Sequence, residues 1–131
     1  MSPLFAGGSK PSDARLDGVR SEVDRLRGLS LEQLAAEVFA RGFDLDNNAH
    51  HGRTSVHDMA LRMVPHYLLQ SQDQIWELEE LIGEGVQLLE HARLAQCTVV
   101  AEDRRIQWVL TRRGRQVAAD GTVLAALQGL A

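Results

Sequence analysis

Apolar side chains recur with a helical period over the first third of this chain. Between residues 13 and 27 they follow three- and four-residue steps, so they form one narrow stripe on a predicted helix. The stripe consists of Leu16, Val19, Val23 and Leu26. A second helix is predicted from Ser30 to Gly42, because Ser30 and Gln33 have the spacing of a capping box and a broad apolar face follows them.

Two further helices are predicted in the middle of the chain. Thr54 or Ser55 should cap a third helix, which should end near Val64 because Pro65 lacks the amide hydrogen that a helix interior needs. The segment over residues 72–92 has the strongest pattern, with one apolar stripe and an opposite stripe that is polar and acidic. The acidic stripe contains Asp73, Glu77, Glu80, Glu84, Gln87 and His91.

Two glycines interrupt this fourth segment. Gly83 and Gly85 each cost about 1 kcal/mol relative to alanine in a helix interior. They either permit close packing against another element or divide the segment into two helices. The sequence leaves these alternatives open.

A two-residue period replaces the helical period after residue 97. Two short runs, residues 98–101 and 106–111, alternate apolar with polar side chains and flank a charged tip at residues 102–105, which predicts a β-hairpin. From Arg112 the pattern is helical again, and Gly121 is expected to interrupt that helix. The predicted elements therefore form a mostly α fold with one β-hairpin.

Aromatic residues make up only 5% of the chain, so aliphatic side chains must fill most of the core. Trp76 and Trp108 are expected to pack between the fourth segment and the hairpin. Cys97 is expected to be a buried strand residue with a structural thiol, because the run that follows it is β-like.

The residues around the hairpin resemble the second half of a winged helix-turn-helix domain. The matching positions are Leu88, Leu89, Ala92 and Leu94 at the helix end, and Leu110, Thr111, Arg112, Arg113, Gly114 and Arg115 after the hairpin. MarR-like and PadR-like bacterial regulators share this outline, and the resemblance covers residues 54–119. It implies a winged-helix-like domain with Thr111 as the cap of its last helix.

Three parts are expected along the chain, in a single compact unit. The glycine, serine and proline of residues 1–11 suggest a flexible leader, and the helical pattern predicts a helical N-terminal extension over residues 12–53. The resemblance implies a winged-helix-like domain within residues 54–131.

Charge is distributed unevenly around the formal net value of −4. Residues 72–92 carry six carboxylates and no lysine or arginine, whereas residues 93–119 carry six arginines against two carboxylates. Winged-helix regulators read bases with the third helix, but carboxylates repel phosphates and release no counterions. The acidic segment is therefore a poor reader of DNA, and the basic segment is the better candidate.

The first functional hypothesis is a DNA-binding transcriptional regulator that uses its basic wing. The residues expected to contact nucleic acid are Arg104, Arg105, Arg112, Arg113 and Arg115. Arginines on a wing can follow the phosphate backbone and enter a minor groove. In the alternative interpretation these arginines pair with the acidic helix beside them.

The second hypothesis is a protein–protein interaction or dimerisation module that does not bind DNA. The residues expected to contact a partner are Glu77, Glu80, Glu84, Leu16, Val19 and Val23. An acidic face beside a basic hairpin favours a charged partner or self-association, and we expect a homodimer. The alternative for the narrow apolar stripe is packing onto its own chain.

The third hypothesis is a metal site in the polar loop over residues 44–53. His50, His51 and His57 are its candidate ligands. The loop begins like an EF-hand, but Ala49 replaces the required glycine and Ser55 replaces the bidentate glutamate, which argues against calcium.

No pattern in the sequence indicates catalysis. We find no phosphate-binding loop and no arrangement of nucleophile and base, so we expect a non-enzymatic protein without a cofactor. No run approaches the ~18 apolar residues of a membrane span, and we predict no signal peptide. A single cysteine is typical of the reducing cytoplasm.

Overall fold

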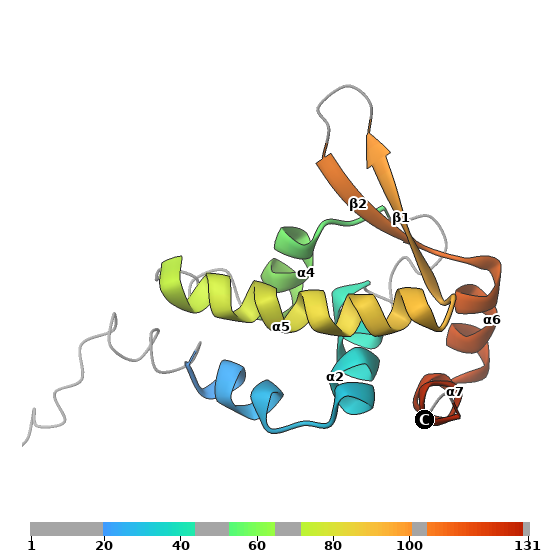
Figure 1. Ribbon diagram of the computed structural model, residues 1–131, viewed down its shortest axis with the longest axis horizontal. Helices are drawn as coiled ribbons and strands as arrows, with labels where there is room; N and C mark the ends of the chain where they lie inside the picture. Colours follow the sequence, from blue (N-terminus) through green and yellow to red (C-terminus); the bar gives the residue numbers. More distant parts are fainter. Residues whose placement is uncertain (1–19, 44–52, 65–71, 101–104, 130–131) are drawn as a thin grey trace, which may run out of the picture.

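The structure, a computed structural model, describes residues 20–43, 53–64, 72–100 and 105–129. A helical segment over residues 20–27 comes first. The elements that follow are α2 (Leu31–Glu37), the π-helix η1 (Val38–Gly42), α4 (Val56–Met63), α5 (Gln72–His91), β1 (Ala95–Val100), β2 (Arg105–Leu110), α6 (Arg112–Asp120) and α7 (Val123–Gln128). The prediction of a mostly helical fold with one β-hairpin is confirmed (Figure 1).

The second predicted helix is present as α2 and η1. The Ser30 hydroxyl accepts a hydrogen bond from the Gln33 amide, and the Gln33 side chain accepts one from the Ser30 amide, so the predicted capping box is formed. The helix ends at Gly42, as expected. A Cβ at Gly42 would lie 3.2 Å from the Met59 side chain, so this glycine allows η1 to approach α4.

Ser55, rather than Thr54, caps α4 by accepting a hydrogen bond from the Asp58 amide. Thr54 instead forms an antiparallel bridge with Trp108: each backbone amide donates to the other residue's carbonyl, over 2.9 and 2.6 Å. The segment before α4 is thereby attached to the hairpin. The helix ends at Met63, close to the position that the following proline predicts.

α5 is one continuous helix of 20 residues, which settles the question of its two glycines. A Cβ at Gly85 would lie 2.9 Å from Val38 Cγ2 and 3.3 Å from Ala35 Cα, so this glycine permits close packing against α2 and η1. A Cβ at Gly83 would have no neighbour within 4 Å. Close packing thus explains Gly85 but not Gly83.

β1 and β2 form an antiparallel pair whose register runs from Ala95 opposite Leu110 to Val100 opposite Arg105. β1 begins earlier than predicted, at Ala95. The interpretation of Cys97 as a buried thiol is wrong: Cys97 lies opposite Trp108 in the ladder and is exposed. Cys97 does lie in a strand, as predicted, but it is exposed because a two-stranded hairpin leaves part of its surface in solvent.

The turn from the hairpin into α6 has the cap that the resemblance implied. The Thr111 hydroxyl accepts a hydrogen bond from the Gly114 amide over 2.9 Å and donates one to the Arg93 carbonyl over 2.5 Å. Arg93 has a φ of 63°, in the left-handed region, at the end of α5. Gly121 ends α6 with a φ of 67°, as expected.

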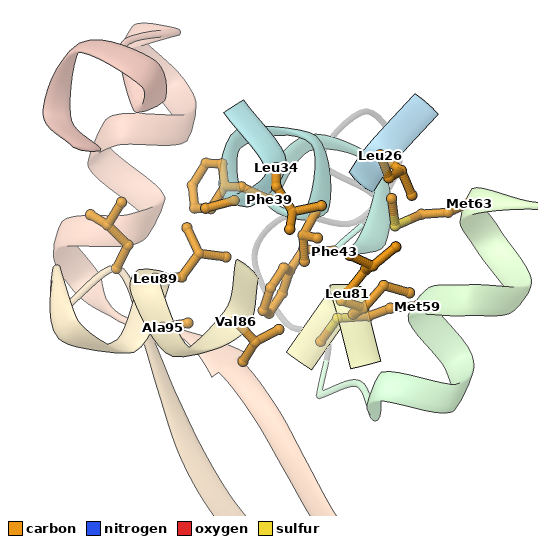
Figure 2. Close-up of a cluster of buried hydrophobic side chains, with 14 of the residues drawn as sticks. Leu26, Leu34, Phe39, Phe43, Met59, Met63, Leu81, Val86, Leu89 and Ala95 are labelled. Carbon is orange, nitrogen blue, oxygen red and sulfur yellow. The ribbon is translucent and has the colours of Figure 1, made fainter. Parts of the chain in front are cut away.

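The core gathers apolar side chains from the helical segment 20–27, α2, η1, α4 and α5, and Figure 2 shows part of it. Phe39, Met59, Leu78, Ile82 and Leu89 are among its fully buried members. Trp108 is half-buried and packs against this core, as predicted.

The prediction that Trp76 fills the core is wrong, because 58% of its surface is exposed. The buried side of α5 is formed by residues such as Ile75, Leu78 and Ile82, and Glu77 next to Trp76 is exposed. The helical period places the indole toward the exposed side with Glu77.

A network of four charged side chains holds the segment 20–27 against α2 and η1. Arg25 and Arg41 each contact both Glu22 and Glu37 over 2.7–3.0 Å. Partial burial raises the pKa of Glu22, but hydrogen bonds from the two arginines outweigh it and bring the pKa below its ordinary value. Hydrogen bonding to Arg25 likewise lowers the pKa of Glu37.

Candidate functional site

Two surfaces of opposite charge lie at different ends of α5. The hairpin base and α6 meet the C-terminal end of α5, whereas the segment 20–27 lies beside its N-terminal half (Figure 1). Glu77, which belongs to the acidic half of α5, lies about 20 Å along the helix axis from Glu90, which lies beside the hairpin base. The charge asymmetry of the sequence is therefore also an asymmetry in space.

The positive surface, which we call the basic edge, consists of Arg93, Arg112 and Arg113. All three side chains are exposed and line a hollow of about 490 Å³. The other residues of its lining are Glu90, Ala95, Gln96 and Thr111. Since Glu90 is the one carboxylate in this lining, the hollow is suited to an anionic ligand.

The geometry of the basic edge follows from two helix ends. Arg93 takes the left-handed conformation that terminates α5, and Arg112 and Arg113 form the first turn of α6 behind Thr111. Sequence reasoning did not select Arg93 as a site residue. In the sequence, Arg93 stands out only because it follows the last turn of the predicted helix. It becomes a candidate contact in the structure, where it lines the same hollow as Arg112 and Arg113 at the start of α6.

The other predicted nucleic-acid contacts are placed differently. Arg115 is half-buried and donates from its guanidinium to the Leu110 carbonyl over 3.2 Å, so it supports the hairpin base. Arg104 lies outside the described residues. Arg105 begins β2, but its side chain is not among those described.

The negative surface, which we call the acidic face, consists of Glu77, Glu80 and Glu84 on α5. All three are exposed, as predicted. Arg27 forms an ion pair with Glu77 and donates a hydrogen bond to its carboxylate over 2.6 Å. Within the described parts of the chain, Glu80 and Glu84 belong to no ion pair.

A pocket of about 270 Å³ lies between the acidic face and the segment that joins residues 20–27 to α2. Its apolar lining, which we call the leucine groove, consists of Leu26, Leu29, Leu31, Leu34 and Leu81. Leu26 and Leu34 form the buried floor, whereas Leu31 is 45% exposed. The carboxylates of the acidic face and Arg27 complete the lining.

The apolar stripe proposed for partner binding is only partly described. Leu16 and Val19 lie outside the described residues. Val23 is 2% exposed and belongs to the core of its own chain. In this single chain Val23 therefore packs internally, which is the alternative that the sequence left open.

Of the three proposed metal ligands, the structure describes only His57, on α4, because His50 and His51 lie outside the described residues. His57 Nδ1 lies 3.1 Å from Glu79 Oε2, and 62% of the His57 side chain is exposed. Within the described ranges, no three or more His, Cys, Asp or Glu side chains gather as a metal site would require.

Searches against family models, curated proteins and solved structures find no match to this chain. In the part of the chain that the structure describes, no helix is both long enough and apolar enough to cross a bilayer.

Proposed function

We propose that this chain is a non-enzymatic binding module of winged-helix type that contacts duplex nucleic acid through its basic edge, as a transcriptional regulator would. The order of α2, α4 and α5 before a hairpin supports the winged-helix assignment. The bridge between Thr54 and Trp108 supports it further, since it joins the segment between the first two of these helices to the wing.

The observation that carries the nucleic-acid proposal is the convergence of Arg93, Arg112 and Arg113 on one hollow at the base of the hairpin. Three exposed guanidinium groups from two elements can contact neighbouring phosphates, and the hairpin would extend from this point along the duplex. The Thr111 hydroxyl bonds both to the Arg93 carbonyl and to the Gly114 amide, so the backbone that carries these arginines is held together at the start of α6.

α5 has no base-reading role in this proposal. Its outer side presents the acidic face, and carboxylates near phosphates weaken binding. Contacts through the basic edge alone predict strong salt dependence and little sequence preference. A cytoplasmic location and a homodimer are parts of the proposal. The single cysteine of the chain supports the location.

The test is the fluorescence anisotropy of a labelled DNA duplex, titrated with the full chain at several salt concentrations. In the variant Arg112→Glu/Arg113→Glu we expect affinity to fall by about tenfold or more, and the slope of log K against log salt to lose about two units. The matched control Arg20→Glu/Arg27→Glu makes the same charge change near the N-terminal half of α5. It should retain most of the affinity.

Two results would contradict the proposal. One is no detectable binding of the unmodified chain to the duplex at low salt. The other is an equal loss of affinity in both double variants, which would indicate a response to net charge and not to the basic edge. Sedimentation velocity of the same samples tests the homodimer.

A second candidate function is a protein-interaction module that uses the acidic face and does not bind DNA. The observation that favours it is the exposure of large apolar side chains beside the acidic face, with Trp76 at 58% and Leu31 at 45%. Exposed apolar surface rimmed by charge is typical of protein-binding sites. If the unmodified chain binds a protein partner but does not bind the DNA duplex, this second function is the correct one.

A further inference from the structure

We infer that the leucine groove binds a basic amphipathic helix of a protein partner, which inserts an apolar side chain while its lysines and arginines contact Glu80 and Glu84. The inference rests on the second candidate function, an acidic protein-binding face on α5, and it names the groove and the chemistry of the partner.

The small size of the groove suits one inserted side chain. Its volume of about 270 Å³ lies below the ~300–1,000 Å³ that small-molecule pockets usually span. Leu26, Leu34 and Leu81 form a floor that is less than one-tenth exposed, so the apolar surface open to a partner comes mainly from Leu31 and Leu29. An inserted apolar side chain would pack against these two leucines.

Leu31 supplies the exposed rim of the groove. It is the first residue of α2, directly after the Ser30 cap, so the capping box fixes the backbone that carries its side chain. Although Leu31 lies beside the buried Leu34, 45% of it faces solvent. A bound apolar residue would cover this surface and remove it from water.

The charges around the groove define the partner. Glu77 is paired with Arg27 over 2.6 Å, but Glu80 and Glu84 have no ion pair within the described residues. Two exposed carboxylates beside an apolar groove complement a helix that carries leucine-like residues on one face and basic residues on the other. An acidic partner would be repelled by the same pair.

The experiment uses the full chain and a fluorescein-labelled peptide of about 18 residues, long enough to form a helix. Leucines recur in it at three- and four-residue steps, and all other positions are lysine or arginine. A second peptide has the same composition in scrambled order, and a third replaces every basic residue by glutamate. We expect the first peptide to bind in the micromolar range, at least about tenfold more tightly than the scrambled one. The glutamate peptide should not bind.

Two matched pairs of variants locate the contact. Glu84→Lys lies beside the groove, whereas Glu90→Lys makes the same charge change at the other end of α5. Leu31→Asp alters the groove, whereas Leu124→Asp alters an exposed leucine on α7. We expect Glu84→Lys and Leu31→Asp each to weaken binding by about tenfold or more, and both controls to stay within about twofold. If circular dichroism shows that Leu31→Asp has lost helix, Leu31→Ser replaces it.

The outcomes separate this inference from the function on which it rests. If Glu84→Lys weakens binding and Leu31→Asp does not, the acidic face binds proteins but the groove inference is overturned. If no basic peptide binds up to about 1 mM, both fail. If sedimentation shows a dimer that Leu31→Asp dissociates, a second copy occupies the groove and the inferred partner is wrong.

Discussion

Gly114 packs directly on the backbone of Leu94. A Cβ at position 114 would overlap the Leu94 carbonyl oxygen and lie 2.9 Å from the carbonyl carbon. The Leu94 carbonyl also accepts a hydrogen bond from the Thr111 amide over 3.0 Å, so it cannot move away without breaking the start of α6. The glycine in the Leu110–Arg115 motif therefore has a structural role in joining α6 to the end of α5.

Replacement of Gly114 by alanine should destabilise the protein. We expect Gly114→Ala to lower the free energy of unfolding by about 2 kcal/mol or more, because the new methyl group collides with backbone and not with a movable side chain. Urea denaturation followed by circular dichroism measures the change. The matched control is Gly83→Ala, whose methyl group meets nothing within 4 Å in the interior of α5. That variant should raise the free energy of unfolding by about 1 kcal/mol.

The left-handed backbone of Arg93 leads to a prediction with opposite effects on stability and binding. A non-glycine residue with positive φ is strained, so Arg93→Gly should raise the free energy of unfolding by about 0.5–1 kcal/mol. The same change removes a guanidinium group from the basic edge, so duplex affinity should fall. Thermal denaturation and anisotropy on one sample test both effects. A variant that loses stability would show that the Arg93 side chain, rather than its backbone, matters for folding.

The network of Glu22, Glu37, Arg25 and Arg41 should make stability depend on pH in acid. The folded-state pKa values of Glu22 and Glu37 are below the ordinary value of 4.5. The unfolded chain therefore binds more protons in this range, and the network stabilises the fold above pH 4.5 but loses this effect as pH falls through the folded-state values.

The variant Glu22→Gln/Glu37→Gln tests this dependence. At pH 7 it should be less stable than the unmodified chain, by no more than about 1 kcal/mol per partly exposed ion pair. The difference should shrink as the pH falls below 4.5. Urea titrations at a series of pH values measure it, and a difference that is constant with pH would contradict the assignment.

The two tryptophans should behave differently. In the variant Trp108→Phe, Trp76 is the only indole, and its emission should resemble that of tryptophan in water and be quenched by iodide. Trp76→Phe should change the free energy of unfolding by no more than about 0.5 kcal/mol, whereas Trp108→Phe should cost about 1 kcal/mol or more. A blue-shifted, unquenched Trp76 would indicate that a partner or second copy covers it.

Most elements of the fold could be predicted because their signals are local. The capping box at Ser30, the end of α4 before a proline and the Thr111 cap all follow from residues within a few positions of each other. The exposed carboxylates of the acidic face follow from the helical period, which separates the two sides of α5.

The errors arose where burial depends on what packs from elsewhere. Trp76 and Cys97 lie in correctly predicted elements but are exposed, because hydrophobic character alone does not say which surfaces another element covers. Gly83 and Gly85 looked equivalent in the sequence, yet only Gly85 has another element, at Val38, against it. Arg93 belongs to the basic edge only because the start of α6 lies against the end of α5.

Periodicity, caps and composition act over short distances, so the amino-acid sequence alone predicts the type and order of the elements and the charge of each segment. Which charged residues share a surface, and where apolar side chains stay open to solvent, depends on how distant segments pack. The basic edge and the leucine groove each combine residues from separate elements, and only long-range packing brings those residues together.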